Sequence, residues 1–354
     1  MKVAVITDQH FGVRGDSVIF HNYFEEYYTN IFFPYLREHG ITTIVDCGDT
    51  FDRRKYTNHK SIEVAKRIFF DVIRDEGMTL HMLIGNHDCY HKNNNKINAP
   101  DLLLGEYDNI IKYHSKPEEL MLGNTKVLMT PWISPENYDD TIAAIDSTDA
   151  QILFGHLELV GFPLHGADQI SMSGMDKKIF KKFDMAYSGH FHQPSKNGNI
   201  QYLGSPYEMN WSDYDKPRGF NIFDTETREM TFVQNKNPMF HKIFYNDDDL
   251  TIEDLQDLNV DALQGKYIKV VVSEKNDPYL YDLFISKIES AGPADMKVVD
   301  DHKNQNLISP DDLIDEAEST DKIMSSYIDN LKTKVNKSKL KSFITELYTD
   351  ALDA

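Results

Sequence analysis

The first ten residues are MKVAVITDQH, a short apolar run that ends in an aspartate and a histidine. Residues 3–6 have the length and β-branched content of a buried strand. Asp8 and His10 follow this run directly. Open α/β sheets bind ligands at the carboxyl ends of their strands, so the stretch predicts a strand that delivers two metal-binding side chains to a sheet edge.

The same order of a strand-like run and then a carboxylate, amide or imidazole occurs four more times. The runs are residues 43–46, 80–84, 151–154 and 185–187, and the segments after them are Gly48-Asp49-Thr50-Phe51-Asp52, Gly85-Asn86-His87-Asp88, Gly155-His156 and Gly189-His190-Phe191-His192. Each segment alone fits a surface turn, a helix cap or a hydrogen-bonded core histidine. Five in succession, each after a strand, favour one shared metal site.

These residue types suit the hydrolysis of a phosphate ester. The reaction needs a nucleophile at neutral pH and stabilisation of added negative charge, and two divalent metals about 3.5–4 Å apart supply both. A carboxylate can bridge two metals, while imidazole and amide oxygen suit manganese, iron or zinc. A further histidine can donate a proton to the leaving oxygen.

The remaining pattern predicts an α/β sandwich with helices outside a central sheet. Residues 20–38 and 59–75 are expected to be helices, and residues 126–129, 199–203, 219–223 and 230–233 strands, the last three antiparallel. From Pro238 the character changes to a small α+β unit, with segments 242–245, 267–272 and 279–290. A polar linker at 300–310 precedes a helical segment at 319–352.

Composition limits the class of protein. The 354 residues contain no apolar run near the roughly 20 needed to span a bilayer, and no signal peptide is visible. Cys47 and Cys89 are too few for a disulfide framework, so we expect buried thiols in a reducing cytoplasm.

The net charge of −20 argues, taken alone, against a nucleic-acid partner. Bound dications would offset several of the acids, and a basic cluster occurs at residues 332–341.

The five motifs, in this order, resemble the calcineurin-like metallophosphoesterase superfamily over about residues 1 to 235. The resemblance implies a β-sandwich flanked by helices and two divalent ions, manganese first and magnesium as the alternative. It implies that His87 is the catalytic acid, held by Asp88. The implied ligands are Asp8, His10, Asp49 and His192 for one metal, and Asp49, Asn86, His156 and His190 for the other, with Asp49 bridging.

A second resemblance narrows the substrate. Asp88 and Arg53-Arg54 depart from the pattern of calcineurin-type phosphatases, whereas residues 131–133, 202–206 and 215–220 resemble the SbcD nucleases, especially the phage recombination endonuclease subunits. This implies a DNA exonuclease or endonuclease in end processing, recombination, repair and replication. Some relatives carry histidine at the position of Asp52, so the departure leaves exonuclease strength and strand preference open.

The SbcD resemblance also implies a layout. Residues 1–238 would form the nuclease domain, 239–300 a capping domain that grips DNA, and 301–354 a linker and helices that dock on an SbcC-like coiled-coil ATPase. Those helices could instead pack on their own domain. The family forms homodimers, and an apolar stripe could serve as dimer interface or as core: Ile62, Ala65, Ile68, Phe69 and Ile73.

Two other functions stay open at this point. The same metal site would serve a small-molecule phosphodiesterase or phosphatase. A scaffold that has lost catalysis is the other alternative, although no ligand position is missing here.

Overall fold

The computed structural model describes residues 1–163 and 170–300, together with positions 328, 337 and 340. Apart from these three positions, the predicted C-terminal helices, their lysine cluster and their docking on a partner lie outside the described residues.

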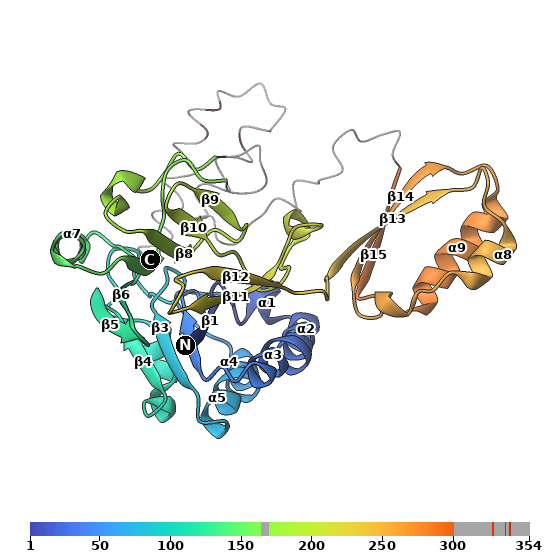
Figure 1. Cartoon of the computed structure of the whole chain (residues 1–354). Helices are drawn as coiled ribbons and strands as arrows, with labels where there is room; N and C mark the ends of the chain where they lie inside the picture. The colour runs from blue at the N-terminus through green and yellow to red at the C-terminus, as the bar shows by residue number, and fades with distance from the viewer. Residues whose placement is uncertain (164–169, 301–327, 329–336, 338–339, 341–354) are drawn as a thin grey trace.

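Two six-stranded sheets form the main body (Figure 1). The first has the order β12-β11-β1-β2-β3-β4 and the second β5-β6-β7-β8-β10-β9. The first is built from β1 (Lys2–Ile6), β2 (Thr43–Asp46), β3 (Thr79–Leu83), β4 (Ile111–His114), β11 (Gly219–Asp224) and β12 (Met230–Gln234). The second is built from β5 (Glu118–Leu122), β6 (Thr125–Thr130), β7 (Ile152–His156), β8 (Met185–Gly189), β9 (Ser195–Asn197) and β10 (Ile200–Tyr202).

The inner faces of the two sheets pack on each other. Val3, Val5 and Val45 of the first sheet meet Ile152 and Phe154 of the second in one buried cluster. Alternate residues of these strands point outward into two further clusters beneath helices. The result is the predicted β-sandwich flanked by helices, which is confirmed.

Two long helical segments cover the outer face of the first sheet. The segment predicted at 20–38 runs through α2 (Val18–Tyr27), the π-helical turn η1 (Tyr28–Phe32) and α3 (Phe33–Glu38). Pro34 cannot donate a backbone hydrogen bond, and the π turn lies just before it. The second segment runs through α4 (His59–Ala65), η2 (Lys66–Phe70) and α5 (Asp71–Asp75), over the predicted residues 59–75.

The remaining helical elements of the main body are short and follow loops. They are α1 (Val13–Asp16), α6 (Ala99–Leu103), η3 (Gly105–Tyr107), α7 (Tyr138–Ser147), η4 (Lys177–Phe180) and η5 (Trp211–Asp213). Ile145 of α7 and Phe180 of η4 pack on the outer face of the second sheet.

One strand assignment was wrong. The segment at 199–203 was expected to pair antiparallel with those at 219–223 and 230–233, because short turns separate them. In the structure β10 belongs to the second sheet and runs parallel to β8, while only β11 and β12 pair antiparallel. Residues 203–218 therefore cross from one sheet to the other, a path that local sequence does not reveal.

A separate three-stranded sheet follows the main body. It contains β13 (Phe240–Asn246), α8 (Ile252–Asp257), η6 (Asp261–Leu263), β14 (Tyr267–Glu274), α9 (Pro278–Ser290) and β15 (Asp295–Asp300). All three strands are parallel in the order β13-β14-β15. This is an α/β unit, which corrects the α+β prediction, because a helix connects each pair of parallel strands.

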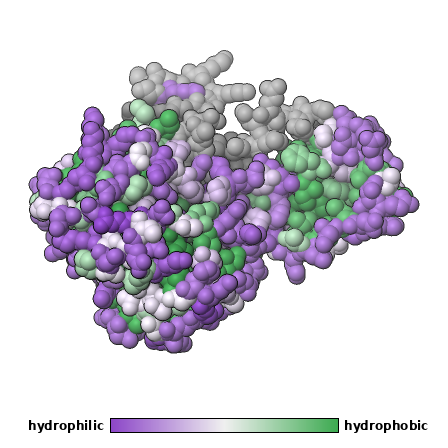
Figure 2. Space-filling model, in the orientation of Figure 1, coloured by the Kyte–Doolittle hydropathy of each residue, from purple (hydrophilic) through white to green (hydrophobic). Residues whose placement is uncertain are grey.

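The small domain is joined to the main body through aromatic packing. Phe240 and Tyr267 stack against each other and on Phe20 of α2, and Trp211 packs on Phe240. Figure 2 shows apolar residues gathered on the small domain and in an area of the main body, whose visible face is otherwise mostly hydrophilic. Phe244 and Val298 of the small domain's sheet are exposed.

The apolar stripe considered for dimerisation is mostly core. Ala65, Ile68, Phe69 and Ile73 are buried in the cluster beneath the first sheet, and Ile62 is half-buried. Core packing therefore explains these residues. Among the described residues no helix has the length and apolarity needed to cross a bilayer.

The loops after β2 and β3 approach each other closely at Gly85. A Cβ atom added there would lie 2.3 Å from the backbone nitrogen of Asp49, at the end of the β2 loop. Only glycine allows this approach, so the residue sets the distance between Asp49 and the Asn86 segment.

We predict that Gly85→Ala lowers the free energy of unfolding by about 1–3 kcal/mol, because the two loops must separate. Gly105→Ala is the matched control, since a Cβ at Gly105 meets no atom within 4 Å. Thermal unfolding of both variants provides the measurement. Equal unfolding temperatures of the two variants would show that the loops can separate without loss of stability, which would contradict the prediction.

Candidate metal centre

Five loops bring the predicted ligands to one edge of the sandwich. Strands β1, β2 and β3 of the first sheet and β7 and β8 of the second deliver them at or just after their carboxyl ends. The structure groups their ligand atoms in three sets, each with members within 4.8 Å of one another. The sets are Asp8, His10 and His192; Asp49, His156 and His190; and His10, Asp52 and His87.

The first set lies next to Asp49. The Nε2 atoms of His10 and His192 lie 3.1 Å apart. Oδ1 of Asp8 lies 4.0 Å from Nε2 of His192, and Oδ2 of Asp49 lies 4.0 Å from Nε2 of His10. These are the four residues expected to hold one metal.

The second set contains the other four expected ligands. Oδ1 of Asn86 lies 2.9 Å from Nε2 of His156, 2.9 Å from Nδ1 of His190 and 3.2 Å from Oδ2 of Asp49. Oδ2 of Asp49 also lies 3.2 Å from Nε2 of His156. This oxygen of Asp49 is thus close to ligand atoms of both sets, as a bridging carboxylate requires.

The chemistry of the donor atoms fits a cation. In the second set an amide oxygen faces a carboxylate oxygen and two ring nitrogens, so electron-rich atoms converge with no hydrogen-bond donor between them unless a ring is protonated. All but His190 of the seven ligands are buried. Buried carboxylates need a compensating positive charge, which a divalent metal supplies.

Four of the ligands adopt unusual backbone conformations. Asp8, His10, Asp49 and His190 have φ angles of 53°, 47°, 56° and 93°, in the left-handed region. Such a conformation costs on the order of 1–3 kcal/mol per residue and persists where the surroundings enforce it. Four such residues lie close together in this site. Their clustering indicates that the loop conformations position the predicted ligands at a cost in local stability.

Asp88 does not hold His87 as expected. Its Oδ2 accepts hydrogen bonds from the backbone nitrogens of Asp49 and Gly85, and its Oδ1 accepts one from Phe51. The Nδ1 atom of His87 instead faces the backbone carbonyl of Asp52 at 2.5 Å. Asp88 therefore ties the two loops together, and Asp52 orients His87.

Two buried acids at this site, Asp52 and Asp46, were given no contact with the ligands in the sequence analysis. Oδ1 of Asp52 lies 3.3 Å from Nδ1 of His10, so it is placed to orient this ligand. Asp46 accepts hydrogen bonds from Gln9, Thr50 and the backbone of Gly48. Burial raises the pKa of Asp46 to about 8. The signal that could have found both acids is their position in or beside the Gly48–Asp52 motif.

The acids of this site raise the pKa values of two of the predicted histidine ligands. Burial alone lowers the pKa of His10, but its hydrogen bond with Asp52 and the charge of Asp49 raise it to about 10. Burial also lowers the pKa of His156, and the charge of Asp49 raises it to about 9. Without a metal, both rings therefore keep a proton at neutral pH and balance the carboxylates.

We predict that metal binding releases protons, because a metal competes with the protons on His10 and His156. Since both pKa values lie above neutrality, the apparent affinity for Mn²⁺ should rise roughly tenfold or more per pH unit between about pH 7 and pH 8.5. Titration calorimetry in two buffers of different ionisation enthalpy measures the released protons. An affinity independent of pH, with equal heats in both buffers, would contradict this electrostatic account.

Comparisons with known proteins agree with this geometry. The family model described as calcineurin-like phosphoesterase matches residues 1–194. Exonuclease subunit 1 of Enterobacteria phage T4 is 30% identical over 362 residues, which cover 99% of each chain. The SbcCD nuclease subunits D of Staphylococcus saprophyticus and Staphylococcus epidermidis are 22% and 28% identical, over 65% and 27% of this chain and 67% and 28% of theirs.

The family match covers β1 to β8 and includes all seven predicted metal ligands, and the phage relative extends the similarity over nearly the whole chain. The chain belongs to the calcineurin-like phosphoesterase family.

Proposed function

We propose that this chain is the nuclease subunit of a two-component DNA-processing enzyme, a manganese-dependent DNA exonuclease and endonuclease. The observation that carries the proposal is the pair of ligand sets that share Asp49 and lie beside His87. The named relatives are nuclease subunits, which supports DNA as the substrate over a small phosphodiester.

The assignment of residues follows the two sets. Asp8, His10, Asp49 and His192 would hold one ion, and Asp49, Asn86, His156 and His190 the other. Two bound divalent ions supply a water-derived nucleophile at neutral pH and neutralise charge on the phosphoryl oxygens. The protein itself fixes the bridging carboxylate, because the backbone nitrogen of His87 donates to Oδ1 of Asp49 at 2.7 Å and leaves Oδ2 directed at both sets.

His87 would protonate the leaving oxygen. Its Nδ1 donates to the carbonyl of Asp52, which fixes the ring and leaves Nε2 for the substrate. The ring packs edge-on against His10 at 4.8 Å, so it lies next to the first metal set. Asp88 would act through the loops and not by contact with His87.

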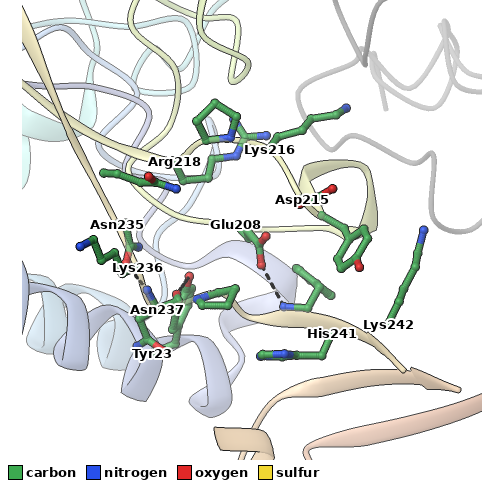
Figure 3. A pocket seen from close by; sticks show the side chains of 15 residues that line it. Tyr23, Glu208, Asp215, Lys216, Arg218, Asn235, Lys236, Asn237, His241 and Lys242 are labelled. Atoms are coloured by element: carbon green, nitrogen blue, oxygen red, sulfur yellow. Dashed lines mark hydrogen bonds between the residues drawn. The ribbon is translucent and has the colours of Figure 1, made fainter. Parts of the chain in front are cut away.

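The pocket between the main body and the small domain supports a polyanionic substrate. It has a volume of about 510 Å³ and is lined by Lys216, Arg218, Lys236 and Lys242, as Figure 3 shows. Two acids, Glu208 and Asp215, also line it, so the four basic residues outnumber the acids in a chain of net charge −20. Arg218 also donates to the backbone carbonyl of His192, which connects the pocket to the metal set.

The proposed organisation is nuclease residues 1–238, a capping domain at 239–300 and an ATPase-binding segment at 301–354. We propose an SbcC-like coiled-coil ATPase as the partner and a homodimer as the assembly. A partner that supplies DNA-binding surface would explain how so acidic a subunit acts on DNA.

We predict that His87→Ser abolishes Mn²⁺-dependent cleavage of single- and double-stranded DNA while DNA and metal binding remain. Loss of a general acid should lower the rate by about 10²–10⁴-fold. His91→Ser is the matched control, since His91 is exposed. Cleavage by His87→Ser at the wild-type rate would show that His87 is not the general acid. Turnover of cyclic nucleotides or monoesters by the wild type, without DNA cleavage, would favour a small-molecule enzyme.

We also predict that Lys216→Gln with Lys236→Gln weakens DNA binding without changing metal affinity. Each lysine that contacts a phosphate should reduce the slope of log affinity against log salt by about 1. Fluorescence anisotropy on the His87→Ser background avoids cleavage during the measurement. Lys112→Gln is the control, because β4 lies at the sheet edge opposite β12. An unchanged salt slope would exclude the pocket from the DNA path.

A further inference from the structure

Arg54 differs from its neighbour Arg53 in what its guanidinium group contacts. Arg53 donates to Oδ2 of Asp16 at 3.1 Å and to the hydroxyl of Tyr56 at 2.8 Å, so its charge is already paired. Arg54 makes no ion pair with any acid of the described residues. Its Nη1 atom is buried and has no hydrogen-bond partner among them.

The guanidinium group of Arg54 faces the second metal set. Its Nη2 lies 3.3 Å from the side-chain amide of Asn86. Because Oδ1 of Asn86 is turned toward His156 and His190, the group facing Arg54 is the Nδ2 donor. Two donors thus face each other beside the metal set, and neither has an acceptor among the described residues.

An arrangement of donors without an acceptor fits an anion. An oxygen that lies to one side of this pair, within hydrogen-bond distance of both nitrogens, would accept from both, and the bond from Arg54 would be charge-assisted and therefore strong. A phosphoryl group held next to the second metal set has such oxygens. The buried Nη1 atom of Arg54, left without a partner, costs about 1–3 kcal/mol, which an anion bound beside the guanidinium group would offset.

We propose that Arg54, together with Nδ2 of Asn86, binds a non-bridging oxygen of the scissile phosphodiester. The inference rests on the proposed phosphodiester hydrolysis and adds a substrate-contacting residue to it. The charge that accumulates on the phosphoryl oxygens during the reaction would then be met by the half-buried guanidinium group of Arg54.

A competing role exists for the same residue. If the amide of Asn86 were rotated, its oxygen would accept from Nη2 of Arg54 and its nitrogen would face His156, His190 and Asp49. Arg54 would then only position Asn86, and Asn86 could not offer its oxygen to a metal. The two roles differ in whether loss of Arg54 weakens phosphate binding or metal binding.

The test uses the full chain with Mn²⁺ and bis(4-nitrophenyl) phosphate as a probe that needs no partner. Arg54→Gln should lower kcat/KM by about 10²–10³-fold, and Arg54→Lys, which keeps the charge, by less. Arg53→Gln should stay near wild type. Mn²⁺ affinity should be unchanged in all three variants. If Arg54 only positioned Asn86 as a metal ligand, Arg54→Gln would weaken Mn²⁺ binding instead.

Binding of inorganic phosphate to the Mn²⁺-loaded protein gives a readout that does not depend on turnover. We expect Arg54→Gln to weaken phosphate binding by about tenfold or more and Arg53→Gln to leave it unchanged. Phosphate binding and turnover equal to wild type in Arg54→Gln would overturn the inference, and so would a loss of Mn²⁺ affinity that accounts for the lost activity. If the wild type binds phosphate at Arg54 but hydrolyses no phosphodiester, the proposed function fails and the inference about the anion site stands.

Discussion

Asp88 makes the interaction on which the metal centre depends. Its buried carboxylate accepts three backbone hydrogen bonds, from Asp49 and Phe51 in the loop after β2 and from Gly85 in the loop after β3. These bonds join the two loops that carry Asp49, the proposed bridging carboxylate, and His87, the proposed general acid. Asp49 can hold its left-handed backbone conformation because its own N–H is fixed in this way. The carboxylate of Asp88, whose contacts are backbone N–H groups, thus fixes the geometry of the loops that carry the predicted metal ligands.

The residues of the candidate metal centre are held in conformations and surroundings that lower the stability of their own loops. Four ligands have left-handed backbone conformations, and carboxylates, imidazoles and an amide oxygen are buried together. The surrounding sandwich stabilises this arrangement through two extensive apolar interfaces, between the sheets and beneath the helices. In the metal-free state, protons on His10 and His156 compensate part of the negative charge. A metal ion bound at this centre would replace those protons, which would link metal binding, protonation and stability.

Sequence alone predicted which residues lie together in the candidate metal centre, but not the contacts that position them. The order of the motifs placed Asp8, His10, Asp49, Asn86, His156, His190 and His192 on strand ends, and the structure brings all seven together. The long helical segments were recognisable because their apolar periodicity continues through the π turns. The path of β10 into the second sheet was missed, since pairing partners distant in sequence leave no local signal. The contacts of Asp88, Asp52 and Arg54 were missed for a related reason: which polar atom a side chain meets depends on loop geometry.

The central claim is that two metal ions share Asp49 in this centre. Anomalous scattering from crystals of the full chain grown with Mn²⁺ tests it most directly. The account predicts two peaks about 3.5–4 Å apart, one contacting His10 and His192 and the other contacting Asn86, His156 and His190, with Asp49 between them. A single peak, or a peak coordinated by His10, Asp52 and His87 in place of the first site, would contradict it.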